Sequence, residues 1–292
     1  MKKILCGSVL LILMVSCTRK PPAAGTPAQV ADTVEIKAED DWLLIGGKRV
    51  HKYDALGYYI LRDEYYTRSE AESLTRVYLN TFPISSKGEA GMREGLDGIE
   101  QLINLEKLAI EHIDINTLDF SPLYTLRNLK EIGFSTADNG MTVFPDLKRL
   151  SSRDSISVVW IKCTGFTSLK NIEYLSNVRH VQIMGGNDYY FVLTGLESLC
   201  QLDKLERLEI LDAYNSAFQV RDIASLTTLK TLELKFKEID LEGIQQLSNL
   251  EYLNLHESGI RDISLLSELN EEVWLEMRER DAETDDGWEP HG

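Results

Sequence analysis

The stretch Leu205-Glu-Arg-Leu208-Glu-Ile210 decides the fold, because its apolar spacing, L-x-x-L-x-L, returns along most of the chain. The second and third apolar positions are two residues apart, so they point to one face of an extended strand. One such unit cannot bury its apolar face alone, and stacked units form a continuous core. Nine copies, 20 to 31 residues apart, have their apolar positions at Leu74/Val77/Leu79, Leu105/Leu108/Ile110, Leu129/Ile132/Phe134, Ile156/Val159/Ile161, Val178/Val181/Ile183, Leu205/Leu208/Ile210, Leu229/Leu232/Leu234, Leu250/Leu253/Leu255 and Asn270/Val273/Leu275.

This unit resembles the leucine-rich repeat, and its downstream half resembles the short bacterial repeats of internalins. The segments that carry this resemblance are residues 166–178 (FTSLKNIEYLSNV), 239–250 (IDLEGIQQLSNL) and 258–269 (SGIRDISLLSEL). The resemblance covers about 70% of the chain. It implies an α/β repeat solenoid, a leucine-rich-repeat horseshoe with a parallel concave β-sheet and short 3₁₀, α or irregular convex segments.

One departure from the family concerns the turn after each strand. The internalin-type repeat usually has Asn three residues after the last strand leucine, where its side chain satisfies backbone groups of the turn. The corresponding residues here are Phe82, Ile113, Ala137, Thr164, Gly186, Ala213, Lys237 and Ser258. Only Thr164 and Ser258 are able to substitute in part, so we expect the other turns to satisfy their amides by a different route.

The N-terminus has the features of a bacterial lipoprotein signal. Lys2 and Lys3 precede an apolar run over residues 4–15, which is too short to cross a hydrocarbon core of about 30 Å. Residues 13–17 (LMVSC) resemble a lipobox, which implies that Cys17 carries the lipid, including palmitate. Thr18 in place of aspartate favours the outer membrane, on either its surface or its periplasmic face. The alternative is an ordinary signal peptide with a chance cysteine.

The sequence therefore divides into five parts. They are the signal peptide (1–16), lipidated Cys17 with a flexible tether (17–35), an N-terminal cap (36–73), about nine repeats (74–276) and an acidic, mostly disordered tail (277–292). Within the cap, Gly46-Gly47 predicts a hairpin, and Thr67 with Glu70 predicts a capping box that opens a short helix.

Composition and motifs exclude several classes of function. The formal charge of −16 disfavours nucleic acid, whose phosphates are bound by Lys and Arg. The motifs G-x-S-x-G, H-E-x-x-H and G-x-x-x-x-G-K do not occur, and the histidines lack metal-ligand spacing. We expect no enzymatic activity, no cofactor, no metal and a monomer. Cys163 and Cys200 fall on different sides of the coil, so we expect two buried free thiols.

The outward-facing residues of the predicted sheet form the candidate site. Trp160, Met184 and Leu211 on consecutive strands are expected to form an exposed apolar centre with a charged rim, which is the usual anatomy of a protein-binding surface. The alternative is a set of unrelated surface residues. The candidate contacts are Tyr78, Trp160, Lys162, Gln182, Met184, Glu209, Leu211, Glu233, Lys235, Tyr252 and Trp274, with Lys162, Glu209, Glu233 and Lys235 as the rim.

A second candidate is an aromatic ridge on the loops of adjacent repeats. Its residues are Tyr189, Tyr190, Phe191, Tyr214 and Phe218. The competing interpretation, which we prefer, is that these rings pack under one another and close the coil over irregular turns.

These features predict a lipid-anchored envelope protein that binds another protein through its concave face. Two other functions stay open from the sequence. One is a structural envelope component without a discrete ligand, and the other is carbohydrate binding, for which aromatic rings over a polar face are suited.

Overall fold

The computed structural model describes residues 41–50, 65–80, 95–136, 140–163, 165–185, 191–255 and 257–277. All of them belong to one compact unit, residues 41–292. Cys17, the signal peptide, the tether and nearly all of the acidic tail lie outside the described residues, so those boundaries stay predictions.

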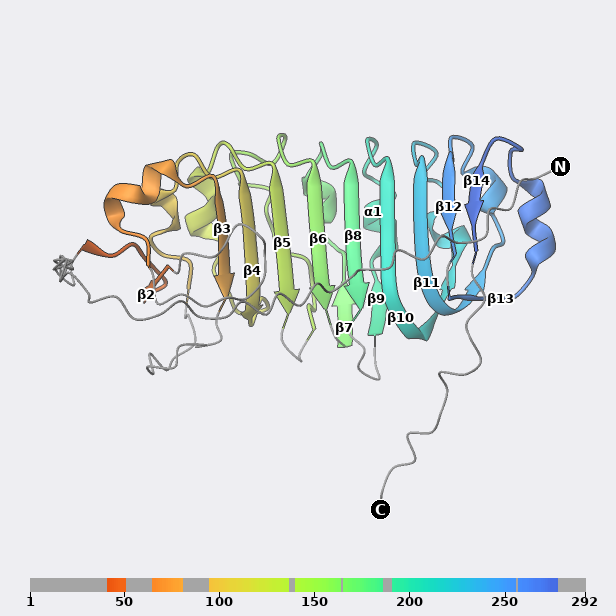
Figure 1. Ribbon diagram of the computed structural model, residues 1–292, viewed down its shortest axis with the longest axis horizontal. Coiled ribbons are helices and arrows are strands. Elements are labelled where there is room, and N and C mark those ends of the chain that lie inside the picture. The colour runs from red at the N-terminus through yellow and green to blue at the C-terminus, as the bar shows by residue number, and fades with distance from the viewer. Residues whose placement is uncertain are drawn as a thin grey trace, which may run out of the picture. The chain divides into compact units, whose positions relative to one another are not determined.

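A parallel sheet runs through this unit, and each repeat adds its strand beside that of the previous repeat (Figure 1). Nine strands follow one another in chain order, and β13 pairs with β11 beside this path. The strands are β3 (Arg76–Asn80), β4 (Lys107–Ile113), β5 (Glu131–Thr136), β6 (Val158–Cys163), β8 (His180–Gly185), β10 (Arg207–Gln219), β11 (Thr231–Asp240), β12 (Tyr252–Asn254), β13 (Gly259–Ile260) and β14 (Trp274–Glu276). The chain is therefore a repeat solenoid of the leucine-rich-repeat type.

The register of the sheet confirms eight of the nine predicted copies. The second apolar residue of each copy lies opposite that of the next, from Val77 through Leu108 to Leu253. The ninth copy was predicted wrongly, because Leu275 rather than Val273 lies opposite Leu253. Val273 belongs to a turn in which its N–H donates to Asn270 O at 3.1 Å, so the strand starts one residue later, at Trp274.

Short helices lie on the side opposite the sheet, as the repeat pattern predicts. They are η2 (Arg68–Ser73), η3 (Ile99–Gln101), η4 (Ser121–Thr125), η5 (Ile172–Tyr174), α1 (Leu196–Leu199), η6 (Val220–Ile223), η7 (Ile244–Gln246) and η8 (Ile263–Glu268). Gly98 precedes η3 with φ of 97°, and an added Cβ would lie 2.3 Å from Leu44 O. Glycine is needed there both for the left-handed backbone and for the close approach.

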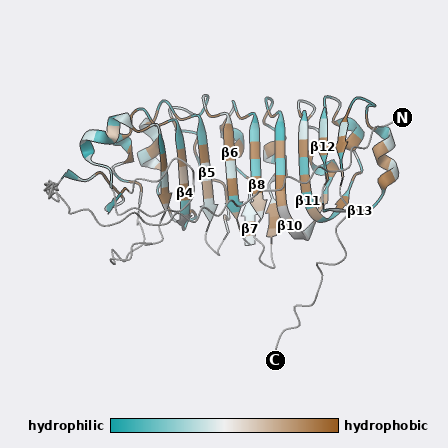
Figure 2. Ribbon diagram, viewed as in Figure 1, coloured by the Kyte–Doolittle hydropathy of each residue, from teal (hydrophilic) through white to brown (hydrophobic). Residues whose placement is uncertain are grey.

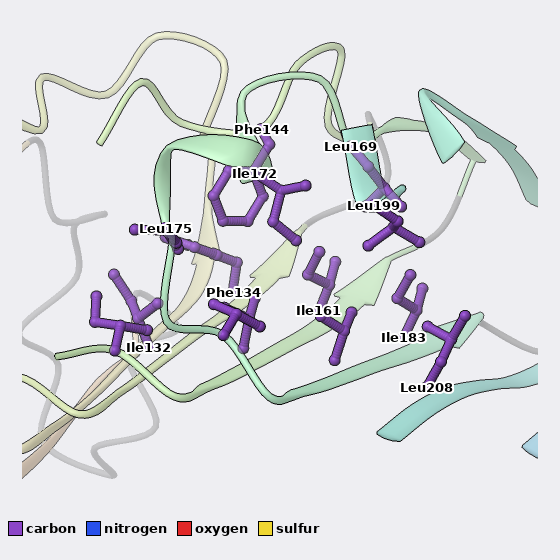
Figure 3. Close-up of a cluster of buried hydrophobic side chains, with 14 of the residues drawn as sticks. Ile132, Phe134, Phe144, Ile161, Leu169, Ile172, Leu175, Ile183, Leu199 and Leu208 are labelled. Atoms are coloured by element: carbon purple, nitrogen blue, oxygen red, sulfur yellow. The ribbon is translucent and has the colours of Figure 1, made fainter. Parts of the chain in front are cut away.

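The core fills the space between these helices and the sheet (Figure 3). Strand residues such as Phe134 and Ile161 meet Phe144 and Ile172 from the opposite side, and all four are fully buried. Phe134 and Phe144 pack edge to face with ring centroids 5.5 Å apart. Hydrophobic and hydrophilic residues alternate along the strands (Figure 2), so only one face of the sheet belongs to the core.

Additional strand pairing satisfies those described turns that lack the family asparagine. β7 (Gly165–Ser168) pairs in parallel with β9 (Phe191–Thr194), and the second halves of β10 and β11 continue their pairing as far as Gln219 and Asp240. Ala213 and Lys237 therefore lie inside strands. Ser258 substitutes as expected, because its hydroxyl accepts from Phe236 N and donates to Leu234 O, both at 3.1 Å. Phe82, Ala137, Thr164 and Gly186 lie outside the described residues.

Three other asparagines, which the sequence analysis missed, tie their repeats to the preceding part of the chain just before β4, β5 and β12. The side-chain amide of Asn104 donates to Glu72 O of the cap (2.8 Å), and those of Asn128 and Asn249 donate to Ile103 O (2.9 Å) and Thr227 O (2.6 Å) of the preceding repeat. Asn104, Asn128 and Asn249 each stand directly before the first apolar residue of a copy, so the signal was the N-L step itself.

The N-terminal cap has the two predicted features. β1 (Leu44–Ile45) and β2 (Lys48–Arg49) form an antiparallel hairpin around Gly46 and Gly47, whose φ values of 52° and 71° are those of a tight hairpin turn. Thr67 N donates to the Glu70 carboxylate at 2.8 Å, as in a capping box, and opens η2. Leu43 and Ile45 are fully buried against the first repeats.

Candidate binding surface on the concave sheet

The concave face consists of the strand residues that alternate with the buried ones, and the register arranges them in three columns. The first column is Arg76, Lys107, Glu131, Val158, His180, Arg207, Thr231, Tyr252 and Trp274; the middle one is Tyr78, Ala109, Gly133, Trp160, Gln182, Glu209, Glu233, Asn254 and Glu276; the third is Asn80, Glu111, Ser135, Lys162, Met184, Leu211 and Lys235. Trp274 therefore belongs beside Tyr252 and not in the middle column where its predicted register placed it.

Trp160 packs against the neighbouring strand β5 rather than toward β8. A Cβ added to Gly133 would lie 1.8 Å from Trp160 Cε2 and 2.3 Å from Cδ2, so the indole lies directly over that glycine. Only glycine leaves room for this contact, because any side chain there would occupy the position of the ring. The prediction that Trp160 joins Met184 and Leu211 in one apolar centre is therefore wrong.

Met184 and Leu211 do lie together. They are direct neighbours in the register of β8 and β10, and both are half-buried. The strand pairing of β10 with β11 shifts just after Ile210, between Ile210 and Ala213, so Leu211 lies at a bulge. The concave face thus has two separate apolar positions, the Met184–Leu211 pair and Trp160 on Gly133.

Glu209 is the centre of a polar network, and it is only 5% exposed. Its carboxylate accepts hydrogen bonds from Gln182 Nε2 at 2.5 Å and from Arg207 Nε, and it lies 2.9 Å from His180 Nε2. Burial alone would raise the pKa of Glu209, but the contacts with His180, Arg207 and Gln182 and the charge of Arg207 outweigh burial and lower the pKa to about 2. The carboxylate is therefore firmly ionised at neutral pH.

The network continues along the next strands. Arg207 Nη2 also donates to Glu233, whose second oxygen accepts from Asn254 Nδ2 at 3.3 Å. On β12 the Tyr252 hydroxyl donates to Glu276 at 2.6 Å. Burial, the hydrogen bond to Glu276 and the negative charges of Glu276 and Glu233 raise the pKa of Tyr252 to about 12. Glu209 and Glu233 are thus held inside the network and do not form the exposed rim that the sequence predicted.

The two predicted rim lysines differ from each other. Lys235 forms an ion pair with Glu257 at 2.8 Å, whereas Lys162 is exposed and makes no ion pair with any residue that the structure describes. Tyr78 is 39% exposed and Trp274 is 57% exposed, so both are accessible as predicted.

The aromatic ridge does not form from the residues whose side chains are described. Phe191 and Phe218 are buried, at 3% and 4% exposure, and Phe218 packs on Phe236 with ring centroids 4.9 Å apart. For these two residues the preferred interpretation, closure of the coil over the turns, is confirmed. Tyr189 and Tyr190 lie outside the described residues, and so does the side chain of Tyr214.

The remaining reactive groups do not assemble into a site. Cys163 is buried and Cys200 half-buried, and both are free thiols; burial raises the pKa of Cys163 to about 11. Within the described ranges, no three His, Cys, Asp or Glu side chains are placed to hold a metal ion. Among those same residues, no helix is both long and apolar enough to span a membrane.

Sequence reasoning missed Gly133, His180, Arg207 and Asn254. Each is an outward-facing neighbour of a residue that was chosen, so the signal was present in the columns once the strands are aligned. The type of a single residue does not show such a contact, because each contact joins two neighbouring strands or two columns.

No protein-family model matches the chain, and no curated protein matches its sequence. Among solved structures it is similar to internalin C2 from Listeria monocytogenes (20% identity, 74% of this chain and 85% of that chain, TM-score 0.44). It is also similar to a leucine-rich-repeat protein of Leptospira interrogans (18%, 72% and 51%, TM-score 0.44) and to a second Listeria monocytogenes internalin (18%, 76% and 87%, TM-score 0.27). The fold assignment is carried by the register of the sheet, where buried positions align strand after strand as in a leucine-rich-repeat solenoid.

Proposed function

We propose that this chain is a lipid-anchored protein of the bacterial cell envelope that binds another protein through its concave face. The observation that carries the proposal is the preorganised surface on β6, β8 and β10. There the Met184–Leu211 pair lies beside the Glu209 network, and the side chains of that network are already fixed by hydrogen bonds. Fixed side chains lose little conformational entropy when a partner docks, which favours binding.

The apolar and polar parts of this surface have separate roles in the proposal. Met184, Leu211 and Trp160 supply apolar area that a partner buries, and the network around Glu209 sets the register of the partner by its shape and charge. A binding role also accounts for the placement of polar side chains in hydrogen bonds with one another rather than around a reactive group.

A photoreactive residue tests the concave site in living cells. Benzoylphenylalanine in place of Met184 is expected to yield one saturable crosslinked partner, because that position faces outward on β8. The control is the same residue in place of Tyr174, which is 36% exposed on η5, on the other side of the repeat.

The outcomes separate the candidate functions. Abundant envelope neighbours from both positions would favour a structural component, and loss of the crosslink on addition of a competing glycan would favour carbohydrate binding. The double substitution Met184→Ser and Leu211→Ser is expected to abolish capture at other concave positions while leaving the thermal unfolding cooperative. Unchanged capture would contradict the concave site.

Anchoring and location are tested separately. The lipobox-like sequence at residues 13–17 supports lipidation of Cys17, so Cys17→Ser is expected to release the protein from membranes and to abolish incorporation of labelled palmitate. Protease treatment of intact cells, followed with an antibody to the repeats, reports the side of the membrane. Loss of the repeats on intact cells would place them outside, and protection until permeabilisation would place them in the periplasm.

A further inference from the structure

The charges of the concave face indicate the chemistry of its partner. We propose that the partner presents an acidic segment with apolar side chains, that Lys162 and Arg76 bind its carboxylates, and that Met184 and Leu211 contact its apolar groups. This inference rests on the proposed function of the concave face and deepens it.

The carboxylates of the concave face already have partners within the chain. Lys107 Nζ binds Glu131, the Glu209 carboxylate contacts three side chains, and Glu233 accepts from Arg207 and Asn254. Glu276 accepts from Tyr252, and Glu111 is also engaged. Carboxylates that are neutralised or hydrogen-bonded in this way offer little to a basic partner, because binding it would break existing contacts.

Two cations of the same face are in the opposite situation. Arg76 on β3 and Lys162 on β6 are exposed, and neither makes a hydrogen bond or an ion pair with a side chain in the part of the chain that the structure describes. Arg207 and Lys235, in contrast, are occupied by Glu209, Glu233 and Glu257. Among the described residues of the concave face, the charged side chains without a partner are therefore cations, although the whole chain has a formal charge of −16.

The register places the free cation next to the apolar pair. Lys162 lies opposite Met184, and Met184 lies opposite Leu211, so the three form one row across β6, β8 and β10. With a strand spacing of about 4.8 Å, this row spans roughly 10 Å. A segment that crosses the strands there would place a carboxylate on Lys162 and apolar side chains on Met184 and Leu211. The apolar part of the row favours a peptide over a polyanion without apolar groups.

The test uses two labelled peptides whose binding is followed by fluorescence anisotropy. One repeats Glu-Glu-Leu-Glu, and the other has lysine in place of every glutamate. We expect the acidic peptide to bind the protein and to lose about tenfold or more in affinity with Arg76→Glu and Lys162→Glu combined, because attraction becomes repulsion at both positions.

The control carries the same change of net charge elsewhere. Arg127→Glu combined with Lys170→Glu alters two exposed cations outside the concave face and is expected to keep the wild-type affinity. Circular dichroism melts verify that both double variants fold. The inference is overturned if both double variants weaken the acidic peptide equally, if the lysine peptide binds the concave face more tightly, or if no acidic peptide binds at about 1 mM. Tighter, concave-dependent binding of heparin would also overturn it.

Failure of this inference can be told apart from failure of the proposed function. Capture at Met184 of a partner whose crosslinked peptide is basic would keep the concave site and remove the acidic segment. Absence of any saturable capture would remove the concave site itself, whatever the peptides show.

Discussion

Two regions of the concave face hold their side chains in place by different physical means. On β5 and β6, Trp160 is held by shape, because the indole fills the space left by Gly133. From β8 to β11, Glu209 and Glu233 are held by charge-assisted hydrogen bonds from His180, Gln182 and Arg207. The first region contains no titrating group in its central contact, whereas the second depends on the ionised state of a carboxylate.

This difference shows what the repeat leaves free to vary. The buried columns are apolar in both regions, whereas the outward columns differ in chemistry. A solenoid can therefore carry a steric and an electrostatic surface on one continuous core. The two regions should therefore respond differently to substitution, pH and salt.

The largest effect is expected from Glu209→Ala. The carboxylate is 5% exposed and contacts three side chains, so its removal leaves the half-buried His180 and Gln182 and the exposed Arg207 without their partner. We expect the free energy of unfolding to fall by about 3 kcal/mol at neutral pH, measured by urea denaturation. Glu233→Ala is the matched control and should lower the free energy of unfolding less, because the Glu233 side chain is 16% exposed and accepts hydrogen bonds from only two side chains, Arg207 and Asn254. Equal costs would contradict a network centred on Glu209.

Acid should weaken the Glu209 region selectively. The pKa of Glu209 is lowered from 4.5 to about 2, so the stability it contributes is fully present above about pH 4.5 and is lost as the pH falls toward 2. Between about pH 5.5 and pH 2.5 we expect the wild type to lose about 2 kcal/mol more than Glu209→Gln, which lacks the titrating carboxylate. Parallel pH profiles of the two proteins would show that the carboxylate is not held in this way.

A smaller and purely steric effect is expected from Gly133→Ala. The added methyl group would overlap the Trp160 ring, so the ring must move away from β5. We expect the free energy of unfolding to fall by about 1.5 kcal/mol and the tryptophan fluorescence emission to shift to the red. In a Trp160→Ala background the same substitution should be nearly neutral, so a double-mutant cycle measures the contact. If Gly133→Ala lowered the free energy of unfolding by the same amount in that background, glycine would be required for the backbone conformation at position 133 and not for the contact with Trp160. The cost should not depend on pH.

The buried part of this molecule could be predicted from sequence because the apolar spacing is strict. From Leu74 to Leu255 the apolar positions recur at the same spacing in every copy, and only one register buries all of them. The last copy departs from this spacing, since polar Asn270 stands at its first apolar position and Val273, Trp274 and Leu275 are consecutive apolar residues. There the turn at Asn270 sets the register, and the apolar pattern does not show it.

The outward face could be predicted as a set of positions but not as a set of contacts. Alternation along each strand shows that Trp160 and Glu209 face outward, yet it does not show the direction in which each side chain leans. That direction depends on the neighbouring strand, where Gly133 makes room for an indole and Arg207 and His180 supply donors. The register between repeats brings these residues side by side, but it does not determine toward which neighbour each side chain leans.

The smallest effect separates the network from ordinary surface ion pairs. Lys107 binds Glu131 across β4 and β5, but the two side chains are 42% and 23% exposed. Solvent screens such a pair, so Lys107→Met is expected to lower the free energy of unfolding by about 0.5 kcal/mol, and about 1 M salt should remove the difference. Arg207→Met should cost more and keep most of its cost in salt, because its partner Glu209 is nearly inaccessible to ions. If salt erased both costs equally, the Glu209 network would be a surface feature like Lys107–Glu131, and burial would not distinguish the two regions.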